Sequence, residues 1–538
     1  MAESEPVKEL TTEDYKALLR GFIGRNEELL GDVKGHPMII HHFLSYHWLV
    51  DEGFDLLVET MEPLIPDVEG PEYRIEFERI EIGEPSSIEP DGARRKIYPM
   101  EARLRNMLYS APLYAEIVMY MDGEEVERDN VYVGEFPVMV RSKICNTYGL
   151  SEEELAEVGE DPKDPGGYFI INGSERVLMS LEDIAPNRRV AEKIRERGVL
   201  DEIRSRVYSR GKRYRGPVDI IDRKGKLVAD IPAVYRRFPV VILLRALGMT
   251  EKEILMSVGR EFATVMAEQL RVLVQEEIAT QEDALEYIGQ LSRPLETREE
   301  RIERGKEVLG KYFLPHIAEL TDEELMDDER VEEVFRKKAE EVVRMVREVL
   351  ELKYKRVKVK SVRDRDHYAN KRIKLAGDLL FEAYEYAFQQ LMREMKYQFE
   401  RAFARGREPS IRYIVRPDKV TDHIRSCMAT GTWRTGHYRP RTGVSQILER
   451  HTWMSTVSHL RRIRAATELG VGKWSIPKEA RYLHPTHMGR LCPNETPEGA
   501  NCGAIKNLAM YAEVVHYDVD EDELMEILED IGLVPAGE

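Results

Sequence analysis

The spacing of apolar residues changes along the chain, and this change restricts the folds that the sequence can adopt. Residues 74–82 alternate between polar and apolar side chains, which is the period of a half-buried β-strand. Residues 250–353 and 375–403 carry apolar side chains at helical spacing, and we interpret the second stretch as a pair of amphipathic helices. The two patterns together predict an α+β chain of several domains, with mixed helices and antiparallel sheets.

Shorter patterns predict further elements. Residues 115–121, 131–133 and 138–140 are typical of additional strands. Ser151 is followed by three glutamates, which predicts a short helix with a capping box. Residues 168–171 are apolar and precede Asn-Gly, so we expect a short buried strand that ends in a tight turn.

The length and the apolar runs limit the class of protein. A chain of 538 residues corresponds to roughly three or four domains. The longest aliphatic run is Val240–Leu244, whereas a membrane-spanning helix needs about 20 apolar residues. The acidic N-terminus, residues 1–5, does not have the pattern of a secretory signal. We therefore expect a cytoplasmic protein that does not associate with a membrane.

Positive charge is concentrated in one part of an acidic chain. The formal net charge is −19, which argues against a simple basic nucleic-acid-binding protein. Residues 429–490, however, contain nine Arg and two Lys against three Glu, and aromatic residues are interleaved with them. This composition suits contacts with phosphate and stacking on bases, although a solvated charged face is an equally good interpretation.

No standard metal or nucleotide motif is present. Residues 470–473 read Gly-Val-Gly-Lys but do not have the other residues that a phosphate-binding loop requires. His484, His487, Cys492 and Cys502 are of zinc-binding type, but their spacing fits no standard zinc finger. A compact loop with hydrogen-bonded histidines is the favoured interpretation, and we predict that this chain binds no metal.

A long motif lies toward the C-terminal end. Residues 484–499 read His-Pro-Thr-His-Met-Gly-Arg-Leu-Cys-Pro-Asn-Glu-Thr-Pro-Glu-Gly. This motif resembles a signature of the second-largest subunit of multisubunit DNA-directed RNA polymerases, which includes the bacterial β and archaeal B families. The resemblance extends upstream through residues 443–446 and 458–462. Residues 364–367 with 371–372, 167–175 and 98–106 also resemble the archaeal and eukaryotic members. Because the chain ends soon after the motif, it resembles the N-terminal half of that protein, most like the B″ polypeptide of the split archaeal form. A truncated piece of a longer chain is the alternative.

The resemblance implies a division into four parts. Residues 1–185 and 373–428 would form the domain called the protrusion, and residues 186–372 would form the lobe. Residues 429–513 would form the fork, which faces nucleic acid. Residues 514–538 would begin an external domain that the partner subunit completes. The cationic stretch falls within the fork, so charge and resemblance point to the same segment.

The resemblance also implies which residues meet nucleic acid. Two fork loops, residues 429–442 and 466–478, would lie near the RNA–DNA hybrid and near the downstream duplex. The predicted nucleic-acid-binding residues are Arg434, Arg439, Arg441, Gln446, Glu449, His459, Arg461, Arg462 and Lys473. The alternative is that these side chains pair with one another inside the fork, for instance Glu449 with an arginine. Glu498 is predicted to lie near the NTP site, although a purely structural role in its turn is an equally good interpretation.

The implied reaction is template-directed synthesis of RNA from NTPs, assisted by two Mg²⁺ ions. In this family the metal-binding aspartates lie on the largest subunit, so we expect no catalytic residue and no cofactor on this chain, and no activity of the chain alone. Its expected role is to wall the active-centre cleft and to position the DNA template and the RNA–DNA hybrid.

The expected partners are the polypeptide that carries the second half of the split protein (B′), the largest subunit, the other polymerase subunits, the DNA template and the nascent RNA. A non-catalytic nucleic-acid-binding scaffold related to the family is the alternative.

Overall fold

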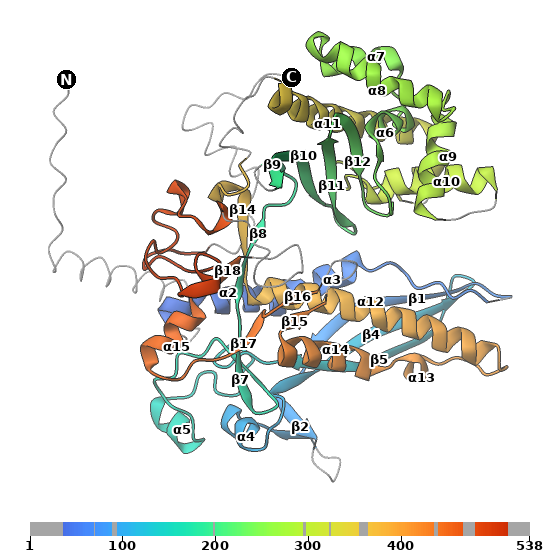
Figure 1. Cartoon of the computed structure of the whole chain (residues 1–538). Coiled ribbons are helices and arrows are strands. Elements are labelled where there is room, and N and C mark those ends of the chain that lie inside the picture. The colour runs from blue at the N-terminus through green and yellow to red at the C-terminus, as the bar shows by residue number, and fades with distance from the viewer. Residues whose placement is uncertain are drawn as a thin grey trace, which may run out of the picture. The chain divides into compact units, whose positions relative to one another are not determined.

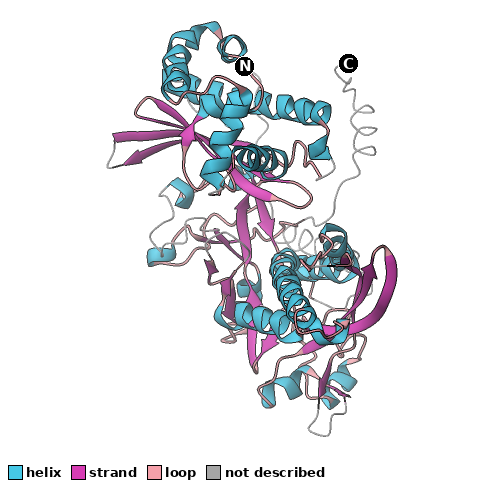
Figure 2. Ribbon diagram, turned by 90° about the vertical axis from the view of Figure 1, so that its right-hand side faces the viewer, coloured by secondary structure: helices cyan, strands magenta, loops and turns pink. Residues whose placement is uncertain are grey.

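The computed structural model describes residues 36–68, 70–88, 94–196, 199–293, 297–321, 324–354, 364–434, 440–465 and 479–514. The chain divides into two compact units. The first unit comprises Met1–Glu182, Ile373–Leu483 and His487–Glu538, and the second comprises Asp183–Arg372 and His484–Thr486. Both units combine helices with largely antiparallel sheets (Figure 1, Figure 2), which confirms the predicted α+β class. None of the described helices has both the length and the apolar character needed to cross a membrane.

The first unit contains one long helix and many short elements. Its helices are η1 (Pro37–Ile39), α2 (Ile40–Trp48), η2 (Leu49–Gly53), α3 (Phe54–Thr60), α4 (Pro99–Leu104), α5 (Glu152–Glu157), α12 (Ala376–Phe403), α13 (Ile411–Ile414), α14 (Pro417–Thr430), α15 (Trp453–Leu460), η8 (Glu479–Arg481) and η10 (Gly499–Asn501). Its strands are β1 (Tyr73–Ile82), β2 (Ser86–Ile88), β3 (Arg94–Lys96), β4 (Ser110–Met121), β5 (Glu124–Pro137), β6 (Phe169–Ile171), β7 (Ser174–Leu178), β15 (Thr432–Trp433), β16 (Arg441–Thr442), β17 (Ser445–Ile447), β18 (Arg462–Ala465) and β19 (Ile505–Asn507). The points at which the chain passes between the units lie in β8 (Ser180–Ile184) and β14 (Lys371–Lys374), and η9 (Pro485–His487) also spans a boundary.

The main sheet of the first unit has the antiparallel strand order β1-β4-β5. In β1, Ile75 and Ile80 are both buried although they differ in parity, because the register with β4 shifts at a bulge after Phe77. Such a bulge inserts one extra residue and turns the following side chains to the opposite face. The predicted strand at residues 74–82 is therefore confirmed, and the bulge explains the change in its alternation.

Helix α12 lies along this sheet (Figure 1) and is a single helix, so the predicted pair of helices is wrong. Between its first turn and its last residue there is no proline or glycine that would end or kink it. Phe388 meets Phe77 of β1 edge to face, with ring centroids 6.0 Å apart. Gly377 allows α2 to approach closely, because a Cβ atom there would lie 1.9 Å from the carbonyl oxygen of Ser45.

Three shorter predictions have mixed outcomes. Residues 138–140 do not form a strand: all three are buried, and the first and third donate their N–H groups to the carbonyl oxygens of Tyr109 and Tyr168. The helix after Ser151 is confirmed, with both hydrogen bonds of the capping box present. The buried strand before Asn172 is also confirmed, because it forms the β6–β7 hairpin.

The second unit places helices beside a five-stranded antiparallel sheet (Figure 1). The strand order is β13 (Phe238–Pro239), β12 (Lys226–Asp230), β11 (Arg215–Arg223), β10 (Val199–Arg210) and β9 (Arg189–Glu196). The helices are α6 (Val240–Ala246), α7 (Glu251–Val258), η3 (Arg260–Phe262), α8 (Ala263–Gln275), α9 (Gln281–Ser292), α10 (Arg298–Glu307), η4 (Val308–Tyr312), η5 (Glu324–Met326), α11 (Asp328–Tyr354) and η7 (Tyr368–Asn370). Thr250, Thr280 and Thr297 each begin a helix with a capping box, which confirms the predicted helical region.

Helix α11 carries a buried cation among its apolar residues. Lys338 is 0% exposed, and its Nζ atom donates to the carbonyl oxygens of Leu309 and Gly310, both at 2.8 Å. Burial lowers the pKa of Lys338 to about 7, because the low-dielectric interior disfavours the charged form. This lysine therefore links α11 to η4 through its two hydrogen bonds.

Candidate nucleic-acid interface

The segment from residue 445 to residue 465 is fixed to the first unit by short strands. Strand β17 pairs with β7, and β18 pairs in parallel with β8 and antiparallel with β19. Between them, α15 begins with a capping box formed by Thr452 and Ser455. The hydroxyl group of Ser445 donates to the carbonyl oxygen of Met428 at 2.6 Å. The motif positions predicted to line the RNA path therefore lie on firmly held backbone.

Four of the predicted residues form one hydrogen-bonded network. The two Nη atoms of Arg462 donate to the carboxylate oxygens of Glu449 at 2.7 and 2.8 Å. The backbone N–H of Glu449 donates to Nδ1 of His459 at 3.1 Å, and Nε2 of His459 lies 3.3 Å from Oε1 of Gln446. Because Nδ1 accepts a hydrogen bond, the neutral ring carries its proton on Nε2 and donates it to Gln446. The structure thus shows the mutual pairing that was the alternative to direct contacts with nucleic acid.

The charges of this network compensate one another. Hydrogen bonds from Arg462 lower the pKa of Glu449, so the carboxylate is ionised and paired. Burial, aided by the nearby Arg462 charge, lowers the pKa of His459 to about 4, so the imidazole is neutral near pH 7. Next to Gln446, the side chain of Ile447 is 65% exposed. The network itself therefore has no net charge, and the exposed Ile447 beside it adds an apolar surface.

Arg461 points into the first unit and is 7% exposed. Its guanidinium group donates to the backbone carbonyl oxygens of Met38, Ala509 and Met510. Beside it, Nε2 of His42 lies 2.7 Å from the carbonyl oxygen of Leu460. Burial lowers the pKa of Arg461 to about 10 and that of His42 to about 4. Its hydrogen bonds give Arg461 a role in joining the segment to η1 and to the residues after β19, and a contact with RNA stays a prediction.

A second ion-pair network holds Arg450, a residue that the sequence analysis did not single out. Arg450 donates to Glu175 at 2.6 and 2.9 Å and to Asp164 at 2.8 Å. Its guanidinium carbon lies 4.8 Å from the ring centroid of Tyr168. Arg103 donates to the same Glu175 at 2.8 Å and to the hydroxyl group of Tyr168 at 2.6 Å. Arg103, Tyr168 and Glu175 belong to two segments that resemble the polymerase family. This resemblance is the sequence feature that could have pointed to the Arg450 network.

The remaining predicted residues lie outside both networks. Arg434 is exposed, and its side chain forms no hydrogen bond or ion pair with any residue in the described ranges. Arg441 on β16 lies 3.6 Å from Glu382 of α12. Glu498 is exposed at the start of η10, and its side chain has no polar partner among the described residues. Two predicted residues lie outside the described residues, and these are Arg439 and Lys473.

Two of the four residues of zinc-binding type, His484 and Cys492, take part in ordinary hydrogen bonds. Nδ1 of His484 lies 2.7 Å from the hydroxyl oxygen of Thr486, and Sγ of Cys492 accepts from the N–H of Glu495. Within the described ranges, no three His, Cys, Asp or Glu side chains lie together as metal ligands would. The carboxylates of the two networks are occupied by arginines, so this donor set does not fit a divalent metal ion.

Comparison with known families agrees with the motif resemblance. Residues 38–422 match a family model described as RNA polymerase beta subunit, and residues 446–514 match one described as RNA polymerase Rpb2, domain 3. The second match contains the Glu449–Arg462 pair and begins within β17. The chain therefore belongs to the RNA polymerase beta subunit family, whose members are subunits of a multisubunit nucleotidyltransferase.

Curated relatives give a finer placement. The chain is 39% identical over 509 residues to DNA-directed RNA polymerase subunit Rpo2N of Methanocaldococcus jannaschii, covering 93% of this chain and 97% of the relative. It is 39% identical over 505 residues to Rpo2N of Halobacterium salinarum, covering 92% of each chain. It is 38% identical over 508 residues to Rpo2 of Saccharolobus shibatae, where the match covers 94% of this chain but 43% of the relative. The chain is thus a subunit of DNA-directed RNA polymerase that corresponds to the N-terminal half of the split archaeal B protein, and its partners are other polymerase subunits.

Proposed function

We propose that this chain forms one wall of the active-centre cleft of the polymerase and positions the DNA template and the RNA–DNA hybrid. The observation that carries the proposal is the network that joins Gln446, Glu449, His459 and Arg462. It holds a surface that has no net charge and whose hydrogen-bonding groups already have protein partners. Such a surface guides nucleic acid of any sequence, because base-specific readout requires free donors and acceptors aimed at base edges.

In this proposal the predicted arginines have different tasks. Exposed cations such as Arg434 contact phosphates, since a guanidinium group without a protein partner is free to donate two hydrogen bonds to one phosphate. Arg461 and Arg462 act by positioning the segment, because their donors are directed at protein oxygens. Arg439, Arg441, Lys473 and Glu498 keep the nucleic-acid and NTP roles that the resemblance implies.

We further propose that the catalytic Mg²⁺ is held by another subunit. The donor set of the described residues does not fit the ion, because the carboxylates of the interface are paired with cations. The proposed direct partners are the chain that carries the second half of the split protein (B′) and the largest subunit. The relatives support the first partner, since the match to Rpo2N of Methanocaldococcus jannaschii covers 93% of this chain and 97% of that protein, whereas the match to Rpo2 of Saccharolobus shibatae covers 43% of that longer protein.

A photo-cross-linking experiment tests the placement of the wall. Benzoylphenylalanine replaces Ile447, which is exposed beside Gln446, in polymerase reconstituted with its partner subunits. We expect cross-links to the nascent RNA or the template strand in active elongation complexes. Val126 on β5, which is 52% exposed, is the matched control and should give no cross-link to nucleic acid. Equal labelling from the two positions, or none from Ile447 in active complexes, would contradict the proposal.

A further inference from the structure

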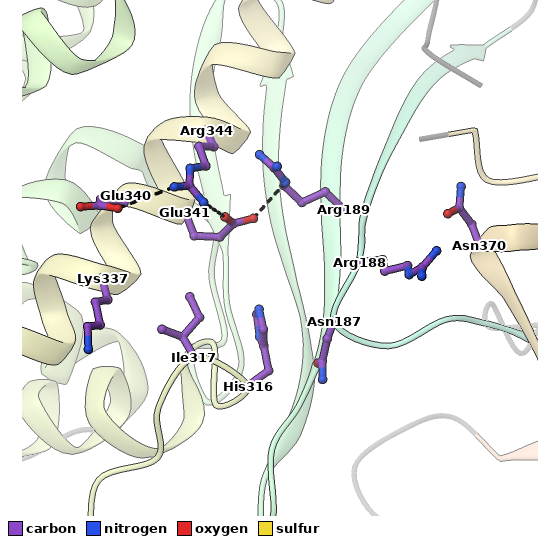
Figure 3. A pocket seen from close by; sticks show the side chains of 10 residues that line it. All are labelled: Asn187, Arg188, Arg189, His316, Ile317, Lys337, Glu340, Glu341, Arg344 and Asn370. Atoms are coloured by element: carbon purple, nitrogen blue, oxygen red, sulfur yellow. Dashed lines mark hydrogen bonds and ion pairs between the residues drawn. The ribbon is translucent and has the colours of Figure 1, made fainter. Parts of the chain in front are cut away.

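The second unit contains a cavity of about 710 Å³ (Figure 3), and one end of it lies beside the family-like segment of residues 364–372. The start of β9, one face of α11, the loop after η4 and the end of η7 form its walls. The lining residues are Asn187, Arg188, Arg189, His316, Ile317, Lys337, Glu340, Glu341, Arg344 and Asn370. Small-molecule sites in proteins are typically about 300–1,000 Å³, so the cavity has the size of a ligand site.

One wall of the cavity has compensated charges. Glu341 of α11 is held between Arg189 of β9, at 3.0 Å, and Arg344, at 3.5 Å, as Figure 3 shows. Arg344 also lies 3.7 Å from Glu340. These distances leave Arg344 with guanidinium donors that are not used in short hydrogen bonds. With Arg188 and Lys337, the lining carries four basic side chains against two acidic ones.

The other end of the cavity has two arginines close by and no carboxylate in its lining. Arg188 points away from α11 toward Asn370 (Figure 3), and its Nη1 atom donates to the carbonyl oxygen of Ala369 at 3.2 Å. Arg372 donates to the same oxygen at 3.3 Å and to the carbonyl oxygen of Lys371 at 2.9 Å. Within the described part of the chain, neither guanidinium group forms an ion pair. Burial, and then the nearby charge of Arg188, lowers the pKa of Arg372, which indicates unrelieved repulsion.

A neutral histidine and an isoleucine lie between these ends. Nδ1 of His316 lies 2.7 Å from the hydroxyl oxygen of Ser209, and burial lowers the pKa of His316. Its Nε2 atom has no hydrogen-bonding partner within the described ranges, and Ile317 adds an apolar surface beside it. The cavity therefore combines an anion-attracting end with a middle that suits an uncharged ring system.

We propose that this cavity binds a small phosphorylated molecule of nucleotide size, with its phosphate oxygens at Arg188 and Arg372 and its organic part beside His316 and Ile317. Two guanidinium groups that meet at one backbone carbonyl present several N–H donors to a third group. A phosphate group accepts such donors in pairs and removes the repulsion between the two arginines. This inference is independent of the wall proposed for the first unit.

Calorimetric titration of the full chain with ADP tests the proposal. We expect that Arg188→Gln and Arg372→Gln each weaken ADP binding at least tenfold without changing the far-UV circular dichroism. Arg347→Gln is the matched control, because Arg347 of α11 pairs with Glu351 and does not line the cavity. Wild-type affinity in both cavity variants would overturn the proposal.

Competition with other anions and a photolabelling experiment distinguish nucleotide binding from binding of any anion or of nucleic acid. Pyrophosphate should displace ADP, whereas sulfate bound as tightly as ADP would mean an adventitious ion only. An oligothymidylate that displaces ADP and binds more tightly through Arg188 would also overturn the proposal, since the surface would then be a nucleic-acid site. In the assembled polymerase, photolabelling with 8-azido-ADP should mark the peptide that contains His316 and Ile317, and Arg188→Gln should abolish that mark. Labelling of the NTP site serves as the internal control.

Discussion

Arginine side chains are used in opposite ways in the interface segment of the first unit and in the cavity of the second. Arg461 and Arg462 direct their donors at protein oxygens, three backbone carbonyls in one case and a carboxylate in the other. Arg188 and Arg372 share a single carbonyl oxygen and have no acidic partner among the described residues. Arg461 and Arg462 therefore build structure, whereas Arg188 and Arg372 are available for a ligand.

The comparison teaches that a basic residue in a family motif is not by itself evidence of contact with nucleic acid. Burying a guanidinium group is costly unless its donors are satisfied, so a buried arginine selects a fixed set of acceptors. Arg461 meets this condition with backbone oxygens from two distant parts of the chain. Arg461 thus acts as a clamp, that is, a side chain that links these two parts of the chain. Its loss should lower the stability of the first unit before it weakens the binding of nucleic acid.

The largest expected change in the free energy of unfolding follows from replacing Arg461. Arg461→Met should lower the free energy of unfolding of the first unit by about 3–5 kcal/mol, because it removes several hydrogen bonds that a buried guanidinium group donates to backbone carbonyl oxygens. Trp48, Trp433 and Trp453 lie in the described part of the first unit, and residues 183–372 contain no tryptophan, so urea denaturation followed by tryptophan fluorescence reports on the first unit. Arg434→Met, at an exposed position, is the control. A loss of less than about 1 kcal/mol, the size of one ordinary hydrogen bond, would show that Arg461 is not a clamp.

The second unit should be destabilised as the pH falls toward neutrality. The pKa of Lys338 is about 7 in the folded chain and 10.5 in the reference state, so the unfolded chain binds more protons between these values. Stability contributed by the neutral amine is therefore present above pH 10.5 and is lost as the pH falls to 7, by about 4 kcal/mol. Hydrogen exchange of α11 amides, corrected for intrinsic rates, should show this slope, and Lys338→Met should remove it. An unchanged slope in the variant would exclude Lys338 as its source.

The first unit should respond to acid in a different window. The pKa of His42 falls from 6.5 to about 4 on folding, mainly because of burial, so the unfolded chain binds more protons between these values. The associated stability is complete above pH 6.5 and is lost as the pH falls to 4, by about 3 kcal/mol. Tryptophan fluorescence during urea denaturation at pH 7 and pH 5 should show the loss, and His42→Asn should reduce it. A loss of stability of the first unit between pH 10 and pH 7, the range predicted for the second unit, would contradict this difference between the two units.

The smallest effect on stability is expected at Arg434. Arg434→Ala should change the free energy of unfolding by less than about 0.5 kcal/mol, because the side chain is exposed and has no partner in the described ranges. Elongation complexes should nevertheless dissociate at lower salt, and the slope of log affinity against log salt should fall by about one. Salt titration of reconstituted complexes measures this. An unchanged slope would remove Arg434 from the nucleic-acid contacts.

Local features of the fold were predictable because their causes are local. The capping box at Ser151, the hairpin turn at Asn172 and the alternation of residues 74–82 depend on neighbouring residues only. Residues 138–140 were misassigned because three consecutive apolar residues fit a strand as well as a buried loop. Their hydrogen bonds go to Tyr109 and Tyr168, which the pattern does not reveal.

The family followed from the sequence, because the order and spacing of the motif residues can be recognised without the fold. Tertiary structure alone decided the roles within the motif. Arg461 and Arg462 are neighbours, yet one is buried against Met38 and Ala509 while the other pairs with Glu449. The cavity likewise depends on segments far apart in the chain. Burial and hydrogen-bonding partners are set by which distant segments meet, and a single sequence does not specify these contacts.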